Sequence, residues 1–159
     1  MTFSDIVEKH FTFLVTQLGY SKILISDMWI KYRLEQQSVI VAYDSTRSYE
    51  VSVSLGDETD VCHSIPFHVL CLAYGSTEQV KQLSSFFSQQ LPAIDGYLQR
   101  VSMFMQEKMQ AILTGNQNEM KKVHNISLTE SLVYTQARKE TVLRKNAEDA
   151  WAKKTMRNS

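Results

Sequence analysis

The stretch VIVAYDSTRSYEVSVSL, residues 39–55, decides the fold. Apolar side chains occupy every second position of its two arms: Val39, Val41 and Tyr43 in the first, and Tyr49, Val51, Val53 and Leu55 in the second. A period of two is typical of half-buried strands. Between the arms, residues 44–48 are small or polar and suit a turn. The stretch therefore predicts an antiparallel hairpin, and the polar opposite face of its second arm predicts a sheet with one side in water.

The residues before the hairpin predict one helix and further strands. Thr2 to Asp5 form a variant capping box, and apolar residues recur at helical spacing from Phe3 to Leu18, before Gly19. Residues 28–34 then alternate with a period of two, and residues 22–25 form a weaker strand candidate. We therefore expect an N-terminal helix followed by an antiparallel sheet of three or four strands.

The second half of the chain predicts helices. Apolar periodicity and breakers indicate helices over residues 65–74, from Ser76 towards Pro92, and over residues 94–113, where Thr114-Gly115-Asn116 ends the last of them. Ser127 and Glu130 form a capping box for a final, highly charged helix that reaches about Lys154. The fold class is α+β. We expect one domain over residues 1–120 and a basic C-terminal helix over residues 121–159, appended to that domain or docked on it.

Composition limits the compartment and the partners. No apolar run approaches the roughly 20 residues of a membrane span, and the N-terminus lacks the pattern of a signal peptide. These features predict a cytoplasmic protein that does not bind membranes. Net charge is zero, but residues 120–159 hold 9 Lys/Arg against 4 Asp/Glu, and residues 1–119 hold 8 against 13. Because acidic residues interrupt the basic tail, solvated ion pairs explain it better than nucleic-acid binding.

The sequence offers one candidate metal set and no catalytic motif. Four residues with zinc-binding chemistry lie within ten positions: Cys62, His63, His68 and Cys71. Their spacing differs from that of paired zinc ligands, so we favour buried thiols and a loop histidine. The chain has no nucleophile elbow, glycine-rich phosphate loop or H-E-x-x-H sequence. We therefore expect no cofactor and no enzymatic activity, and we interpret Asp44 with Arg47 as a local ion pair that closes the hairpin turn.

Three passages resemble a known group of proteins. They are Phe11-x2-Leu14-x3-Leu18-Gly19-Tyr20, Tyr43-Asp44-x2-Arg47-Ser48-Tyr49-Glu50-Val51, and Ile112-Leu113-x-Gly115-Asn116. Together they are similar to small bacterial α+β proteins, some of which resemble immunity proteins of polymorphic toxin systems. The resemblance covers most of residues 3–120 and carries no catalytic residues.

The resemblance implies a non-enzymatic binder that neutralises a toxin by stoichiometric binding. If the toxin were basic, an acidic surface would speed its association. The candidate partner-binding residues are Trp29, Asp44, Arg47, Glu50, Asp57, Glu58 and Asp60. The alternative function is an oligomeric scaffold or regulatory subunit that assembles through residues 127–159, and nucleic-acid binding ranks below both.

Overall fold

The computed structural model describes residues 1–58 and 64–157 of the chain. It divides into two units, Met1–His124 and Asn125–Ser159. The first unit holds the sheet and most of the helices, and the second is helical through Arg157.

The first helix, α1, spans Phe3–Thr16 and begins with the predicted capping box. The backbone N–H of Thr2 donates to Asp5 Oδ2 at 2.8 Å, and the N–H of Asp5 donates to Thr2 Oγ1 at 3.2 Å. These bonds satisfy two backbone donors that a helix N-terminus leaves free. The buried side of the helix carries six apolar residues: Phe3, Ile6, Val7, Phe11, Phe13 and Leu14. Gly19 follows with φ of +80°, a conformation that glycine adopts without strain.

Within the described residues, six antiparallel strands form the sheet. Their bounds are β1 Ser21–Ser26, β2 Trp29–Leu34, β3 Gln37–Tyr43, β4 Glu50–Asp57, β5 Ser64–Pro66 and β6 Phe86–Phe87. The order is β1-β2-β3-β4-β5, and β6 pairs with the start of β4. The opening stretch forms the β3–β4 hairpin, in which Val41 lies opposite Val53 and Val39 opposite Leu55. The α+β class with an antiparallel sheet is confirmed. The sheet has more strands than the three or four expected, since the sequence pattern did not reveal β5 and β6. These strands have only three and two residues, too few for an alternating pattern.

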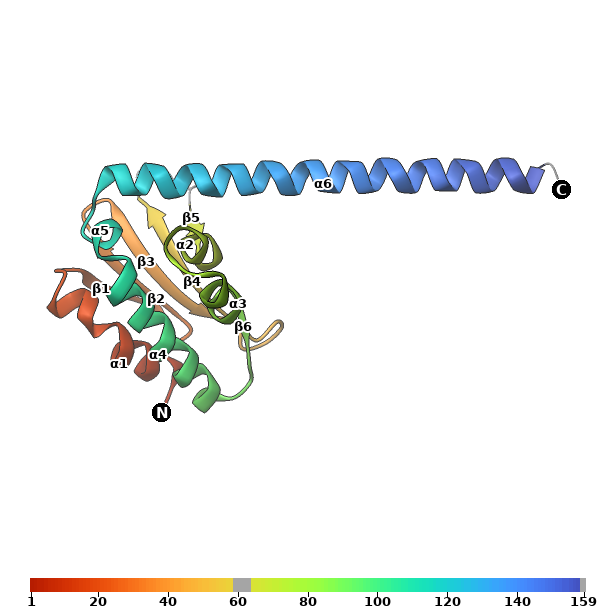
Figure 1. Cartoon of the computed structure of the whole chain (residues 1–159). Coiled ribbons are helices and arrows are strands. Elements are labelled where there is room, and N and C mark those ends of the chain that lie inside the picture. Colours follow the sequence, from red (N-terminus) through yellow and green to blue (C-terminus); the bar gives the residue numbers. More distant parts are fainter. Residues whose placement is uncertain (59–63, 158–159) are drawn as a thin grey trace. The chain divides into compact units, whose positions relative to one another are not determined.

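Helices cover one face of this sheet. They are α1, α2 Phe67–Tyr74, α3 Thr77–Leu83, α4 Leu91–Lys108 and the short α5 Gln110–Leu113. Figure 1 shows α1, α2 and α4 on the same side of the strands. Ring contacts join the layers: Phe11 of α1 stacks on Tyr32 of β2 with centroids 6.4 Å apart, and Phe67 of α2 meets Phe104 of α4 edge-on at 5.7 Å. The core therefore lies between these helices and the inner sheet face.

Several helix boundaries differ from the sequence prediction. The helix expected from Ser76 towards Pro92 ends at Leu83, and Phe86–Phe87 forms β6. Residues 64–66 belong to β5, so the helix expected from residue 65 begins at Phe67. The helix expected over residues 94–113 is divided at Met109, whose φ of −112° and ψ of 15° are not helical. Met109 is fully buried, so the break turns the chain without exposing its apolar side chain.

The last helix, α6, spans Gln117–Arg157 and begins ten residues before the predicted cap at Ser127. Asn116 performs the capping, because its side-chain Oδ1 accepts from the backbone N–H groups of Asn118 at 3.0 Å and Glu119 at 3.2 Å. Gly115 precedes it with φ of +92° and provides the reversal after α5. The capping-box sequence at Ser127 thus lies inside a helix that has already begun.

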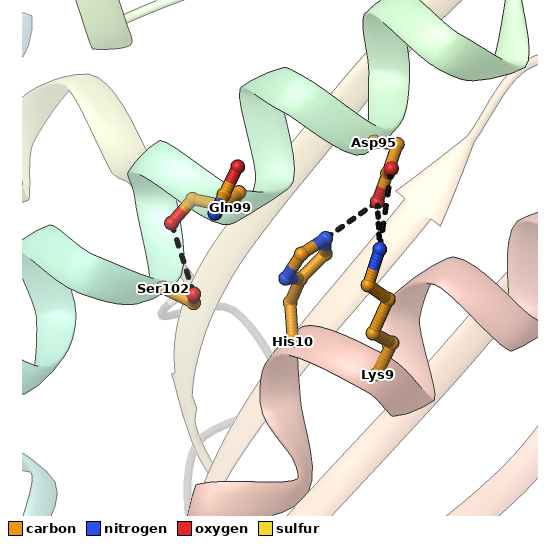
Figure 2. A network of polar contacts seen from close by, with 5 residues as sticks. All are labelled: Lys9, His10, Asp95, Gln99 and Ser102. Carbon is orange, nitrogen blue, oxygen red and sulfur yellow. Dashed lines mark hydrogen bonds and ion pairs between the residues drawn. The ribbon is translucent and has the colours of Figure 1, made fainter.

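Polar contacts also connect α1 with α4 (Figure 2). His10 Nε2 lies 2.6 Å from Asp95 Oδ1, and Lys9 Nζ lies 3.4 Å from Asp95 Oδ2. The hydrogen bond from His10, more than Lys9, holds the pKa of Asp95 below its usual range. His10 therefore has a structural partner on the neighbouring helix.

Candidate partner-binding surfaces

The turn between β3 and β4 is organised around Asp44. Its carboxylate accepts from the backbone N–H groups of Thr46 at 3.2 Å, Arg47 at 3.1 Å and Ser48 at 3.2 Å. These bonds, led by those from Ser48 and Thr46, hold the pKa of Asp44 well below its usual range. The expected ion pair is therefore replaced by a bond to the Arg47 backbone. Asp44 is committed to the turn.

Replacing Asp44 by alanine is expected to lower the melting temperature at neutral pH, because three backbone donors lose their acceptor. The folded-state pKa of Asp44 is lowered, so its contribution is present above the unfolded pKa of about 3.9 and disappears as pH falls through the folded value. Thermal unfolding of both proteins between about pH 7 and pH 2 measures this. A stability gap that stays constant over this range would contradict the assignment.

The remaining described acidic candidates lie at the two ends of β4, Glu50 at its start and Asp57 with Glu58 at its end. Glu58 forms an ion pair with Lys31 of β2, and the hydrogen bond from Lys31 lowers the pKa of Glu58. Asp57 lines a hollow of about 310 Å³ at the β2–β3 turn, whereas Glu50 lines a separate hollow of about 360 Å³ beside His68. Asp60 lies outside the described residues. Lys31 balances the charge of Glu58, so this carboxylate contributes less negative charge to a surface that could attract a basic partner.

The hollow at the β2–β3 turn is lined mainly by polar residues. Its lining is Leu34, Glu35, Gln36, Gln37, Asp57, Thr114, Gly115, Gln117 and Met120. The buried amide of Gln37 is committed to the core, since its Nε2 donates to the Tyr20 hydroxyl and to the carbonyl of Ile112, both at 2.8 Å. These described lining residues include the carboxylates of Glu35 and Asp57 and the hydroxyl of Thr114, but no histidine, cysteine or lysine.

Trp29 lies on the sheet face opposite the helices, here called the open face. The strand register places Ile23 beside Lys31, and Lys31 shares a face with Trp29 and Arg33 on β2. Trp29 is 45% exposed and Ile23 is 39% exposed, so two large apolar side chains meet water there. Exposed aromatic residues of this kind are frequent anchors in protein interfaces.

Two of the four candidate metal ligands, His68 and Cys71, lie within the described residues. Cys62 and His63 lie outside the described residues. Cys71 is fully buried in α2, and this burial raises the pKa of its thiol to about 12. His68 is half-buried on the same helix. Within residues 1–58 and 64–157, no three His, Cys, Asp or Glu residues lie close enough to hold a metal ion. Cys71 therefore has the environment of a structural thiol.

Asp95, His10 and Ser102 are residue types that occur together in hydrolases, so their arrangement matters. Figure 2 shows that the hydroxyl of Ser102 donates to the carbonyl of Gln99 on its own helix, at 3.0 Å. Ser102 is buried, so its hydroxyl is not presented to a substrate. The contact between His10 and Asp95 therefore connects two helices and does not activate a nucleophile.

The second unit presents an exposed helix with an unusual surface. Seven large apolar side chains between residues 131 and 157 are each more than half exposed: Leu132, Val133, Tyr134, Val142, Leu143, Trp151 and Met156. Residues 125–157 also hold 7 Lys/Arg and 4 Asp/Glu, so their net charge is 7 − 4 = +3. In proteins, most of the stability of a helix comes from tertiary packing of an apolar face. The segment therefore exposes large apolar side chains among charged ones.

Two further findings bear on function. No helix built from the described residues combines the length and apolar character needed to cross a membrane. Comparison with protein-family models, curated proteins and solved structures found no match to this chain.

Proposed function

We propose that this protein is a non-enzymatic protein-binding module that docks on a partner through the helical segment Asn125–Arg157. The observation that carries the proposal is the set of seven large apolar side chains exposed along that segment. Burial of apolar area contributes about 25 cal/mol per Å², so leaving these side chains in water forgoes several kcal/mol. A partner groove that covered one side of the helix would recover the part of this free energy that belongs to the four residues sharing a side at helical spacing: Leu132, Val133, Leu143 and Trp151.

The helix has spacing that suits recognition in a groove. Leu132 and Leu143 are 11 residues apart, which is about three helical turns, and Trp151 follows 8 residues later. Such spacing places large side chains along one side of a helix, as in other helix-in-groove complexes. The net charge of +3 favours a groove with carboxylates at its rim. The partner would thus be an acidic protein with an apolar groove.

The proposal is tested by changing the apolar anchors alone. Leu143→Glu combined with Trp151→Glu is expected to weaken partner binding at least 30-fold, because each anchor carries about 2 kcal/mol or more at a well-packed interface. Gln136→Glu with Thr155→Glu adds the same number of carboxylates at polar, exposed positions of the same helix and is the matched control. Cross-linking in the source cells, followed by mass spectrometry and titration with the purified partner, measures the difference.

The test compares partner binding by three proteins: the native chain, the anchor variant and the control variant. Capture of one acidic protein by the native chain and the control, but not by the anchor variant, supports the proposal. Equal capture by all three would overturn it. A nucleic acid recovered with the native chain and displaced by salt would instead assign the helix to electrostatic binding.

Toxin neutralisation is the narrower form of this proposal, and the cytoplasm is its setting. In that case the captured partner would be a toxin, and co-expression would protect the host. Co-expression with the product of the adjacent gene tests this directly. A neighbouring product without toxicity, or toxicity that persists with the native chain present, would remove the immunity role and leave the binding proposal intact.

A further inference from the structure

Strand β1 is an unpaired edge of the sheet. It pairs with β2 on one side, and no described strand adjoins its other side. All six residues from Ser21 to Ser26 are exposed. Alternate backbone N–H and C=O groups of an edge strand point away from its only neighbour, so β1 presents unused hydrogen-bonding groups in a row.

The composition of β1 does little to prevent another strand from joining it. Proteins commonly protect such edges with lysine, proline or a bulge. The centre of β1 is Ile23-Leu24-Ile25, each at least 39% exposed, and residues 21–26 contain no proline. Lys22 is paired with Glu8 of α1 at 3.4 Å. The register with β2 shifts only between Leu24 and Ser26, which leaves Ser21–Leu24 as a regular edge.

A backbone edge is recognised by another extended strand, because only that geometry matches its donors and acceptors. We propose that two copies of this chain pair antiparallel through β1 about a two-fold axis near Ile23 and Leu24, so that their sheets become continuous. This association goes beyond the proposed function and does not depend on it.

Charge complementarity favours a second copy in the antiparallel direction. Lys22 lies at the start of β1, and Asp27 follows its end. Antiparallel pairing brings the start of each strand beside the end of the other, so Lys22 of one copy, still in contact with its own Glu8, approaches Asp27 of its partner. Parallel pairing would place like charges together. Two identical antiparallel strands also satisfy the symmetry of a closed dimer, which leaves no further β1 edge for a third copy.

The pairing also gathers apolar surface. Ile23 and Trp29 lie on the open face of the sheet. A two-fold axis perpendicular to the sheet keeps the open faces of both copies on the same side, so these residues would form one shared patch. A six-residue strand is only about 20 Å long, and the interface is therefore smaller than a standard one. We expect a weak dimer that depends on concentration.

Sedimentation velocity of the full chain, over about 1 to 500 µM, tests the pairing. The weight-average mass is expected to rise from 18.3 kDa towards twice that value. Ile23→Lys puts two ammonium groups near the axis and is expected to raise the concentration of half-association at least tenfold. Met103→Lys makes the same chemical change at an exposed position of α4 and is the control. Leu143→Lys separates this association from any contact made by the C-terminal helix.

The pattern of association across the native chain and the variants decides whether β1 forms the interface. Association lost in Ile23→Lys and retained in the other two variants supports the β1 pairing. A native chain that stays monomeric at every concentration overturns it. Association retained in Ile23→Lys but lost in Leu143→Lys also overturns it, and assigns self-association to the helix.

A measurement on the native chain covers the case in which Ile23→Lys does not fold. Hydrogen exchange of the amides in residues 21–26 is expected to slow at high concentration, because outward N–H groups become bonded in the dimer. Exchange in residues 29–34, which already have neighbours on both sides, should not change. Exchange in β1 that is independent of concentration would overturn the proposal without any variant.

Discussion

Replacing Phe11 by alanine is expected to lower the free energy of unfolding by about 3 to 5 kcal/mol. Phe11 is fully buried on α1 and stacks on Tyr32 of β2. Removing its ring deletes transfer free energy and leaves a cavity between the helical layer and the sheet, where close-packed neighbours relax only in part. A domain of this size has a total stability of about 5 to 15 kcal/mol, so the loss is a large fraction of it.

Thr12→Ala provides the matched control for this substitution. Thr12 neighbours Phe11 on the same helix, but it is exposed. Its replacement is expected to change stability by less than about 0.5 kcal/mol, since alanine is a better helix former than threonine. Urea denaturation followed by circular dichroism measures both variants. Equal midpoints for Phe11→Ala and the native chain would show that α1 does not pack on the sheet as described.

Elements with strong periodicity could be predicted from the sequence. The β3–β4 hairpin alternates through both arms, and one face of each arm is buried as its pattern requires. The exception is Tyr49, which was expected to share a face with Val51. Its φ of 56° places it in the turn, and the strand begins at Glu50. Alternation therefore identifies strands but not the residue at which a turn ends.

A cap sequence identified the start of a helix only where no earlier cap had already begun that helix. The capping boxes at Thr2 and Ser76 both form. Asn116, which was expected to end the preceding helix, lies eleven residues before Ser127, and the chain between them has no glycine or proline. Once Asn116 satisfies the first N–H groups, continuing the helix adds one hydrogen bond per residue and a second start has no advantage. Sequence alone does not rank two such caps.

For the candidate surfaces too, the positions of some residues could be predicted from the sequence and those of others could not. The period of β2 already separates Trp29 from the buried Ile30 and Tyr32, so its place on the outer face could be derived. From charge alone, Asp44 was expected to pair with the side chain of Arg47. In the structure its carboxylate accepts from three nearby backbone N–H groups of the turn instead. The partnership of Glu58 with Lys31 joins residues 27 positions apart, and only the strand register brings them together.

Buried tyrosines lead to the last prediction, which is loss of stability in alkali. Tyr20, Tyr32 and Tyr97 are each at most 2% exposed. The hydroxyl of Tyr20 donates to the carbonyl of Leu113 at 2.7 Å, and that of Tyr97 donates to the carbonyl of Leu83 at 2.8 Å. A phenolate has no proton to donate, and its charge would be buried in the core. Burial accordingly raises the pKa of Tyr20 and of Tyr32 to about 12, and raises that of Tyr97 as well.

The sign of the effect follows from linkage. An unfolded tyrosine loses its proton near pH 10, whereas the folded ones retain theirs, so their contribution is complete below about pH 10 and is lost as pH rises towards 12. A shift of two pKa units corresponds to about 2.7 kcal/mol, so Tyr20 and Tyr32 together remove about 5 kcal/mol. That loss alone approaches the lower limit of a domain's stability. We therefore expect cooperative unfolding between about pH 10 and pH 12.

Tyr20→Phe separates this mechanism from general charge repulsion at high pH. At neutral pH the variant is expected to lose about 1 to 3 kcal/mol, because the carbonyl of Leu113 keeps only a longer bond from Gln37 and one N–H of Gln37 loses its acceptor. Above pH 10 its stability should fall less steeply than that of the native chain, since one buried phenol no longer titrates. Urea unfolding at a series of pH values, with tyrosinate absorbance recorded in parallel, measures both slopes. Parallel slopes for the two proteins would show that deprotonation of Tyr20 does not contribute to alkaline unfolding.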